Sequence, residues 1–291
     1  MLPSNASAHP RLTAASRSAV YLEVTKPRIT AMVLLTVAAG FFLAPASLAG
    51  AAALPHVLIG ALLSCSGAGA LNQYLERHSD SVMDRTRFRP LPLHKVAPGS
   101  ILAYGLVLSA GGVAYLAASV GLLTAAVDAL TLGSYLFVYT PLKRVSPLST
   151  LVGAVPGALP PLMGWTAATG KIQTGGLILF SILFLWQIPH FLAVGRLYKK
   201  DYELGGFPML VCIDAEGDIT GRQMVLYSLA LLPVSMMPSV VGLTGTLYFC
   251  GALVLGLGYL AAAVAARWDM AAASSRRLLL ASITYPPLLI G

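Results

Sequence analysis

The chain has 291 residues, of which 57% are hydrophobic and only 10% charged. Soluble domains carry roughly 25% charged residues, so this sequence has too few charges to cover a water-exposed surface. Its hydrophobicity excludes a disordered chain. Three scattered cysteines without a CxxC pair exclude a disulfide framework and argue against a cysteine-based metal or haem-attachment motif. A polytopic membrane protein remains.

Apolar stretches long enough for membrane helices recur along the whole chain. We predict an all-α, polytopic transmembrane bundle of about nine spans, with residues 1–24 as an N-terminal cytoplasmic tail and 25–291 as a single transmembrane domain. The last stretch is too short for a full span, so a half-span or an incomplete span is expected there. The predicted spans are 29–49, 55–75, 101–121, 125–142, 148–167, 175–195, 223–242, 244–266 and 278–291.

The formal net charge of +8 raises the possibility of a nucleic-acid partner. Among the 19 lysines and arginines, however, only Lys171 falls on the far side of the predicted spans. This asymmetry follows the positive-inside rule and predicts that the charged face is cytoplasmic. No module interleaves basic and aromatic residues, so a nucleic-acid partner is excluded. Residues 1–22 lack acids and faintly resemble a mitochondrial transit peptide, but a plain tail and a multi-pass protein of the bacterial inner membrane are favoured.

A first polar cluster lies at the cytoplasmic end of the second span. Asn72, Glu76 and Asp80 follow one another at i, i+4 and i+8, so all three point along one helix face. Aligned hard oxygen ligands suit Mg²⁺, which binds through a few carboxylates and substrate phosphates. Arg85 and Arg89 follow and offer forked donors to phosphate. An ordinary helix end with i,i+4 ion pairs is the alternative; three aligned ligands followed by the RPLP terminus favour the functional interpretation.

A second cluster lies below the sixth span. Tyr198 and Asp201 share a helical face there, before Gly205, Gly206 and Pro208 stop the helix. Taken alone, this segment is a charged turn. Its position, at the cytoplasmic end of another even-numbered span, predicts one site shared by two half-bundles.

Three intramembrane features are less specific. The stretch VGAVPGALPPLMGW (152–165) contains too many Gly and Pro residues for a lipid-facing helix, so it should pack on protein or line the cavity. His190 is a candidate ligand or orienting group for haem iron, although a hydrogen-bonded packing histidine is the favoured alternative. Asp128 is expected to cap the fourth span at the outer interface.

The pattern N-x-x-x-E-x-x-x-D-x-x-M-x-R-T-x-x-R-P-L at 72–91 resembles the first Asp-rich motif of the UbiA-type intramembrane prenyltransferases, and most closely that of the haem farnesyltransferase branch. The superfamily's second motif is usually DxxxD, whereas position 205 is Gly here, as in the haem branch. Supporting segments in the same order are TKPRIT (25–30), YTPLKRVSP (139–147), GALPPLMGW (157–165), WQIPHF (186–191) and DYELGGFPML (201–210).

The resemblance implies a helical bundle with a central cavity open to the cytoplasm. It implies transfer of the farnesyl group of farnesyl diphosphate to the 2-vinyl group of haem B, which gives haem O and diphosphate. Mg²⁺ is the expected cofactor, and farnesyl diphosphate, haem B and membrane lipid are the expected partners, with haem A synthase or terminal oxidase assembly as a further one. The expected Mg²⁺ set is Asn72, Glu76, Asp80 and Asp201, and the expected substrate-binding set is Arg85, Arg89, Lys143, Arg144, Tyr198 and His190.

Two alternatives stay open at this stage. A sister prenyltransferase with another aromatic or tetrapyrrole acceptor has the same residue pattern, because nothing in the spacing distinguishes haem. A multi-span transporter is also a bundle with broken helices. The acidic clusters lie at one face, and the outer loops are nearly uncharged, which disfavours a transporter. For Lys143 and Arg144, plain topology anchoring competes nearly evenly with diphosphate binding.

Overall fold

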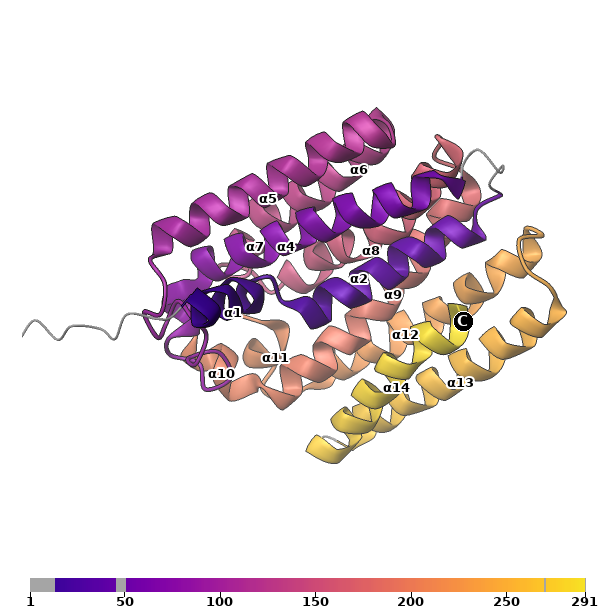
Figure 1. Cartoon of the computed structure of the whole chain (residues 1–291). Coiled ribbons are helices and arrows are strands. Elements are labelled where there is room, and N and C mark those ends of the chain that lie inside the picture. Colours follow the sequence, from indigo (N-terminus) through magenta and orange to yellow (C-terminus); the bar gives the residue numbers. More distant parts are fainter. Residues whose placement is uncertain (1–13, 46–50, 270, 291) are drawn as a thin grey trace, which may run out of the picture.

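The computed structural model describes residues 14–45, 51–269 and 271–290, and in this part of the chain it consists of helices joined by turns and loops, without strands (Figure 1). A long helical segment lies in each of the nine ranges predicted to span the membrane, although residues 46–49 of the first range and residue 291 of the last lie outside the described residues. These segments are α2 (Pro27–Leu43), α4 (Ala53–Asp80), α5 (Pro98–Ser119), the continuous run α6 (Leu122–Gly133), η1 (Ser134–Tyr139) and α7 (Thr140–Leu142), α8 (Ser149–Thr169), α9 (Thr174–Leu197), α12 (Asp218–Val240), α13 (Thr246–Trp268) and α14 (Ala272–Ile290).

Not all nine segments satisfy the length and composition of a membrane span. In the described ranges, six helices are long and apolar enough to cross a membrane, and a seventh span arises if the bent pair of α1 (Ala14–Val24) and α2 counts as one. The shortfall lies in α8, which is rich in Gly and Pro, and in α14, which carries Arg276 and Arg277 in its second turn. The protein is thus a multi-pass helical bundle, and the predicted number of nine spans is not confirmed.

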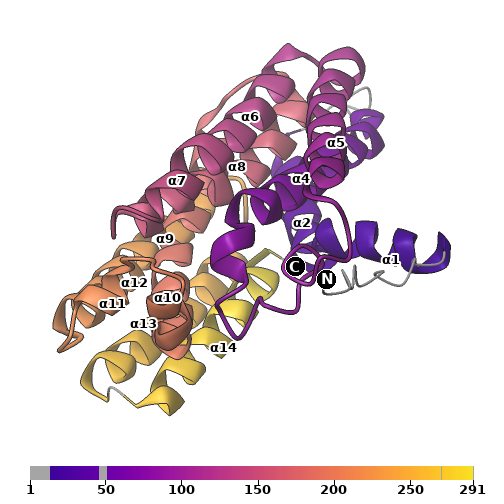
Figure 2. The same ribbon diagram turned by 90° about the vertical axis from the view of Figure 1, so that its left-hand side faces the viewer.

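The bundle is built from neighbouring helices that pack along their lengths. The closest pairs are α4 with α5, α2 with α8, α8 with α9, and α12 with α13 (Figures 1 and 2). The helix pair α4 and α5 meets through a stripe of small residues, where a Cβ on Gly67 would lie 2.3 Å from the Ser109 hydroxyl. Small residues let membrane helices approach closely and gain van der Waals contact.

The proline-rich α8 packs on protein, as predicted. It continues through Pro156, Pro160 and Pro161, and most of its residues are buried. Its backbone approaches α2 so closely that a Cβ on Gly164 would lie 1.9 Å from the Val37 carbonyl oxygen. The helices around it can satisfy the backbone groups that proline leaves open.

Three expectations need correction. The predicted N-terminal tail contains a helix, α1, whose Val20 and Val24 are buried; residues 1–13 lie outside the described part. The last helix starts at Ala272, so it is longer than the predicted 278–291 segment; Gly291 is outside the described residues. Asp128 does not cap a helix: it lies inside α6, is 2% exposed, and accepts a 2.5 Å hydrogen bond from Ser64 of α4. A buried carboxyl needs such a donor.

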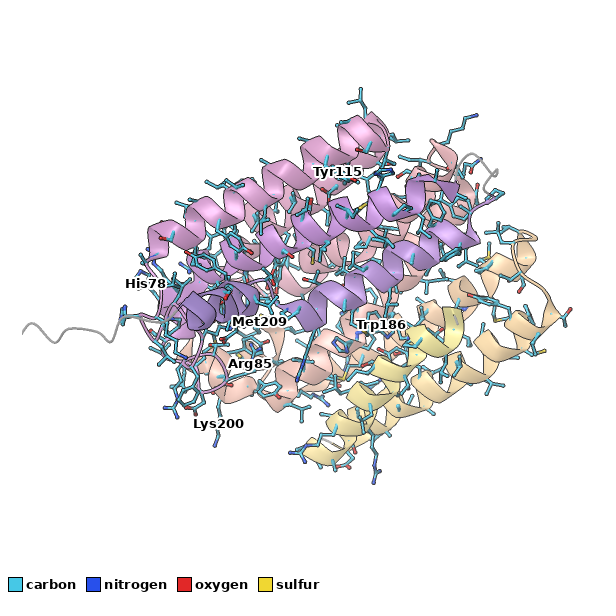
Figure 3. The ribbon with its side chains drawn as sticks, viewed as in Figure 1. His78, Arg85, Tyr115, Trp186, Lys200 and Met209 are labelled. Atoms are coloured by element: carbon cyan, nitrogen blue, oxygen red, sulfur yellow. The ribbon has the colours of Figure 1, made fainter. Side chains whose placement is uncertain are left out.

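Two short helices, α10 (Lys199–Leu204) and α11 (Leu210–Ile213), lie in the segment between α9 and α12. They lie at the same end of the bundle as the loop 81–97 that follows α4 (Figure 2). His78, Arg85 and Lys200 lie at this end, while Tyr115 lies towards the opposite end (Figure 3). The fold therefore brings both predicted polar clusters to one end.

Candidate functional site

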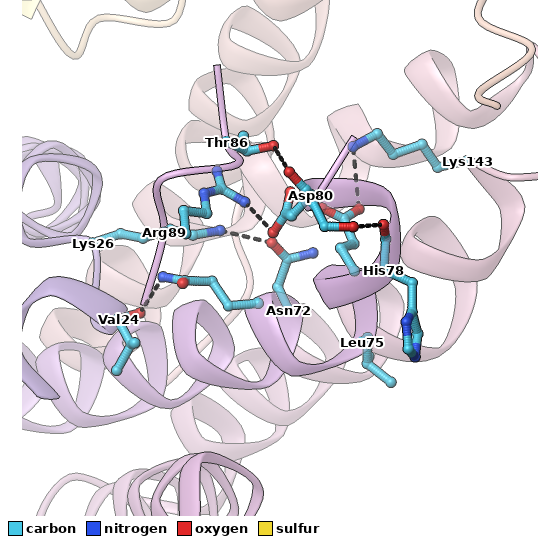
Figure 4. A network of polar contacts seen from close by, with 12 residues as sticks. Val24, Lys26, Asn72, Leu75, His78, Asp80, Thr86, Arg89 and Lys143 are labelled. Atoms are coloured by element: carbon cyan, nitrogen blue, oxygen red, sulfur yellow. Dashed lines mark hydrogen bonds and ion pairs between the residues drawn. The ribbon is translucent and has the colours of Figure 1, made fainter. Parts of the chain in front are cut away.

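The predicted ligand face of α4 exists, and each of its three polar groups is bound by a cation from a different part of the chain (Figure 4). Asn72, Glu76 and Asp80 are 3%, 4% and 1% exposed. Buried polar and charged groups are costly unless they are paired. The three pairs therefore decide how the surrounding segments are placed.

Lys26 binds the first of these groups. Its Nζ donates to Asn72 Oδ1 at 2.7 Å, although the two residues are 46 positions apart. Lys26 stands at the N-terminus of α2 with φ 53°, a left-handed conformation that few non-glycine residues adopt. The sequence analysis missed this residue. The TKPRIT segment could have indicated it, because proline favours the first position of a helix, which places the preceding Lys26 at the helix start.

Lys143 binds Glu76, the second polar group of the α4 face. Its Nζ lies 3.1 Å from Glu76 Oε1, and both side chains are almost wholly buried. The ammonium also lies 4.3 Å from the centre of the Phe207 ring, a cation–π contact. Burial alone would lower the pKa of Lys143, but the neighbouring Tyr139 and Glu76 outweigh it and hold that pKa above its ordinary value. Lys143 thus stays charged.

Arg89 binds Asp80, the third polar group of the α4 face. Its guanidinium donates to Asp80 Oδ2 at 2.7 Å, while the Thr86 hydroxyl donates to the Asp80 carbonyl oxygen at 3.0 Å. These contacts fold the 81–97 loop back onto the end of α4. The other carboxylate oxygen, Asp80 Oδ1, is buried without a hydrogen-bond partner. An unpaired buried carboxylate oxygen has capacity for one more ligand.

The second predicted cluster meets the first through this loop. Asp201 Oδ1 accepts a 3.0 Å hydrogen bond from the backbone N–H of Asp84, across 117 residues of sequence. Beside it, the Arg85 guanidinium lies 5.5 Å from the centre of the Tyr198 ring. Tyr198 and Asp201 therefore belong to the same end of the bundle as Asp80, as the shared-site interpretation predicted.

The donor chemistry fits a hard divalent cation, since amide and carboxylate oxygens are the ligands that Mg²⁺ prefers. The unpartnered Asp80 Oδ1 supports this fit. Within the described ranges, no three His, Cys, Asp or Glu side chains are grouped closely enough to hold a metal. In this structure Lys143 pairs with Glu76 Oε1 and Arg89 pairs with Asp80 Oδ2, so one oxygen of each carboxylate is engaged by a cation.

Two of the predicted substrate-binding residues lie apart from this cluster. Arg144 is exposed and donates to the Leu75 carbonyl oxygen at 2.7 Å, on the outer side of α4. His190 lies eight residues before Tyr198 on α9, about 12 Å along the helix axis. Its Nδ1 is 2.7 Å from the Ser282 hydroxyl, and its ring stacks on Trp186.

A helical irregularity adds aromatic groups that the sequence analysis also missed. The π-helical segment η1 stacks Tyr135 on Tyr139, with ring centres 5.6 Å apart. Tyr139 lies close enough to α8 that a Cβ on Gly153 would lie 2.6 Å from its ring. Single-turn π-helices occur often at functional sites, but periodicity alone gives no signal for them.

The structure is an apolar helical bundle with carboxylates and cations gathered at one end. The UbiA prenyltransferase family model matches residues 33–283, so the chain belongs to this family, as its motifs predicted.

Relatives extend over nearly the full length. The chain is 42% identical over 280 residues to the protoheme IX farnesyltransferase of Solibacter usitatus, covering 93% of this chain and 96% of that protein. It is 41% identical over 295 residues to the protein of the same name from Anaeromyxobacter sp., covering 99% and 97%.

Solved structures show the same fold. A digeranylgeranylglyceryl phosphate synthase superposes with a TM-score of 0.78 at 12% identity, covering 94% of this chain and 96% of that one. A UbiA homolog from Archaeoglobus fulgidus, solved with GPP and Mg²⁺, superposes with a TM-score of 0.68 at 16% identity, covering 92% and 97%.

The Lys143–Glu76 pair yields a prediction about stability. Lys143→Met should lower the free energy of unfolding by about 3–5 kcal/mol, because it leaves the Glu76 carboxylate buried and unpaired. Adding Glu76→Gln to that variant should restore part of the loss by removing the unpaired charge. Unfolding midpoints of the detergent-solubilised variants measure both effects. Equal destabilisation by the single and double variants would contradict the pairing.

Proposed function

We propose that the chain is a haem farnesyltransferase. It transfers the farnesyl group of farnesyl diphosphate to the 2-vinyl group of haem B, giving haem O and diphosphate. The observation that carries this proposal is the full-length similarity to proteins named protoheme IX farnesyltransferase, combined with a buried set of carboxylates and cations at the charged end of the bundle.

The proposed reaction begins when the C1–O bond of farnesyl diphosphate breaks and the electron pair leaves with diphosphate. The resulting allylic cation is attacked by the terminal carbon of the vinyl group, which forms the new C–C bond. Water adds to the cation left on the other vinyl carbon and loses a proton, which gives the hydroxyethylfarnesyl group. Diphosphate departure is the step for which charged protein groups matter most.

Three cations are proposed to hold the diphosphate. Arg89 and Lys143 already lie at the α4 carboxylates, and Lys26 reaches Asn72 from the opposite side. Arg85, on the exposed loop beside Tyr198, is available to close over the phosphates. Guanidinium groups bind phosphate with two parallel hydrogen bonds, while ammonium groups act as point charges. Arg144, which is held on the Leu75 carbonyl oxygen, is proposed to contribute long-range charge only.

Asn72, Glu76, Asp80 and Asp201 would hold Mg²⁺. When bound, the ion would neutralise charge on the leaving diphosphate. The unpartnered Asp80 Oδ1 supports this assignment. A structural relative solved with GPP and Mg²⁺ supports it as well.

The protein surroundings of this site favour a dry reaction. The buried Met83, Phe207 and Met209 lie around Lys143 and the 205–209 turn, where a Cβ on Gly205 would lie 3.0 Å from the Met83 sulfur. Excluding water protects an allylic cation from hydrolysis and strengthens electrostatic contacts. These apolar side chains are therefore proposed to cover the reacting carbon.

His190 is proposed to lie on the haem side of the reacting pair. Its Nδ1 is held by Ser282, which fixes the ring and leaves Nε2 as the nitrogen available to haem. Tyr198 is proposed to close the diphosphate end through Arg85. The charge asymmetry supports a site that faces the cytoplasm, in the inner membrane of a bacterium. Haem O would then pass within the membrane to haem A synthase or an oxidase under assembly.

The direct test is incubation of the purified full chain with farnesyl diphosphate, haem B and Mg²⁺ in lipid nanodiscs. We expect a more hydrophobic haem whose mass has increased by one farnesyl group plus one hydroxyl group, together with one equivalent of diphosphate. Consumption of farnesyl diphosphate only with another aromatic or tetrapyrrole acceptor would point to a sister enzyme. A protein that consumes none, but moves a solute across vesicles, would be a transporter.

Mg²⁺ dependence should reside in both acidic clusters. Asp201→Asn should lower kcat by about 100-fold or more, because the departing diphosphate loses stabilisation in the transition state. Asp80→Asn and Glu76→Gln should behave alike, and chelation of the metal should silence the wild type. The control is Glu203→Gln, which removes an exposed acid from the same short helix. Initial rates across a Mg²⁺ titration measure the effect; a normal kcat for Asp201→Asn would make Asp201 only a turn residue.

The Arg89 guanidinium should act on the diphosphate. A hydrogen bond to a charged group is worth about 1.5–3 kcal/mol, so Arg89→Ala should lower kcat/KM by roughly 10- to 150-fold. Arg89→Lys should recover only part of this, because an ammonium cannot make the bidentate contact. Arg87→Ala is the matched control, since Arg87 lies in the same loop, is exposed, and forms its ion pair with the exposed Asp84. The affinity for haem, followed by absorbance, should barely change. If the variant lost its affinity for haem but still bound farnesyl diphosphate, Arg89 would act on haem and not on the diphosphate.

A further inference from the structure

The corner between α1 and α2 is a strained part of the backbone, and it carries Lys26. The two helices are bent by 51° at this corner, where only Thr25 and Lys26 separate them. Lys26 adopts a left-handed conformation with φ 53°. Such a conformation costs a non-glycine residue free energy and persists only where the surrounding structure holds it. The contacts that hold this corner therefore decide where the Lys26 ammonium group lies.

The Val24 carbonyl oxygen is the acceptor through which α4 holds the corner. Val24 is the last residue of α1, so its carbonyl group has no later donor within that helix. Among the described residues, no backbone N–H of the corner donates to this oxygen either. Gln73 of α4 supplies the missing donor, because its Nε2 donates to the Val24 carbonyl oxygen at 3.2 Å. Since Val24 is fully buried, loss of this donor would leave the carbonyl group unpaired.

The Gln73 amide makes this bond at a cost in hydrogen bonding. Gln73 is 2% exposed, and its Oε1 is buried without a hydrogen-bond partner. Exchanging the two ends of the amide would bring the carbonyl oxygens of Gln73 and Val24 together, so the bond to Val24 sets the orientation of the amide. A buried unpaired oxygen opposes folding, and a hydrocarbon side chain of similar size would avoid that cost. The amide is therefore explained by the backbone that it holds.

Neighbouring positions of α4 complete the seat of this corner. Gly69 lies four residues before Gln73 on the same helix face, and a Cβ on Gly69 would lie 3.2 Å from the Val24 carbonyl oxygen. The end of α1 thus rests on α4 through a hydrogen bond and a close backbone approach. Asn72, which directly precedes Gln73, accepts the hydrogen bond from Lys26 Nζ at 2.7 Å (Figure 4). Two adjacent α4 residues therefore hold the backbone and the side chain of one corner.

We propose that Gln73 is a positioning residue for Lys26. Through the Val24 carbonyl group it fixes the backbone from which the Lys26 side chain extends to the diphosphate end of the site. The inference rests on the proposed role of Lys26 in holding diphosphate. The attraction between an ammonium group and a phosphate depends on their separation, so a displaced corner would weaken diphosphate binding without removing any charge. Gln73 would thus affect diphosphate binding only while Lys26 is present.

A double-mutant cycle between Gln73 and Lys26 tests this dependence. The affinity of the full chain for farnesyl thiodiphosphate, a slowly reacting analogue, is measured by calorimetry in lipid nanodiscs with Mg²⁺. Gln73→Met should weaken this affinity about three- to tenfold, and Lys26→Met about tenfold or more. The double variant should match Lys26→Met within about twofold, because the contact that Gln73 positions is already gone. Gly69→Ala displaces the corner by volume and keeps the amide, so it provides a second variant that should weaken binding only when Lys26 is present.

Gln173→Met is the matched control, because Gln173 precedes α9 at the end of that helix remote from the acidic clusters, where it accepts a 3.1 Å hydrogen bond from Trp165. Its affinity should stay within about twofold of the wild type. If Gln73→Met weakened binding equally with and without Lys26, the positioning role would be overturned and the proposed function would stand. A coupled loss in a chain that farnesylates no haem would support the positioning role and refute the haem acceptor alone. A wild type that bound no farnesyl thiodiphosphate would overturn both.

Discussion

The structure depends on one constraint, which is that each polar group buried on α4 must have a hydrogen-bonded or oppositely charged partner where water cannot reach it. Removing a charge from water costs several kcal/mol unless a well-placed partner and further hydrogen bonds compensate. Here the partners of Asn72, Glu76 and Asp80 come from the start of α2, the end of α7 and the 81–97 loop. The charged end of the bundle is thus assembled around α4, and segments far apart in sequence are held there by electrostatic need.

The same constraint explains why this site suits a charged substrate in an apolar cavity. The cations that neutralise the carboxylates are the groups that the proposed diphosphate would require, and the carboxylates are the groups that the proposed Mg²⁺ would require. A metal ion would pair with the carboxylates, and a diphosphate would pair with the cations. When both bind together, no buried charged group is left without a partner. Binding either one alone would disturb the pairs, which favours ordered binding of both.

The face of α4 could be predicted from sequence because helical spacing alone aligns residues 72, 76 and 80. The location of Asp201 at the same end of the bundle as the α4 cluster followed from the position of the two clusters below even-numbered spans, whereas its hydrogen bond with the backbone of Asp84 did not. Lys26 could not be found in this way, because its partner lies 46 residues away and its backbone is left-handed. Asp128 was misread as a cap, because a sequence does not reveal that Ser64 of another helix donates a hydrogen bond to it. The number of spans stayed open for a similar reason. Because α8 is buried against other helices, it can contain prolines, and these prolines lower the mean hydropathy by which a membrane span is recognised.

The placement of the site on α4 also determines how accurately it is held. Gly60, Ser64 and Gly67 of α4 face α5, where a Cβ on Gly60 would lie 2.4 Å from Leu116 and one on Gly112 would lie 2.2 Å from the Ser64 hydroxyl. The ligand face begins at Asn72, rotated by about 100° from Leu71, the last residue of that contact stripe. Rotation of α4 would therefore drive backbone into side chain along the α5 contact before it moved a carboxylate far from its cation. Close packing on one face of the helix thus fixes the direction of the ligands on the adjacent face, which a site that needs several charges within hydrogen-bond reach requires.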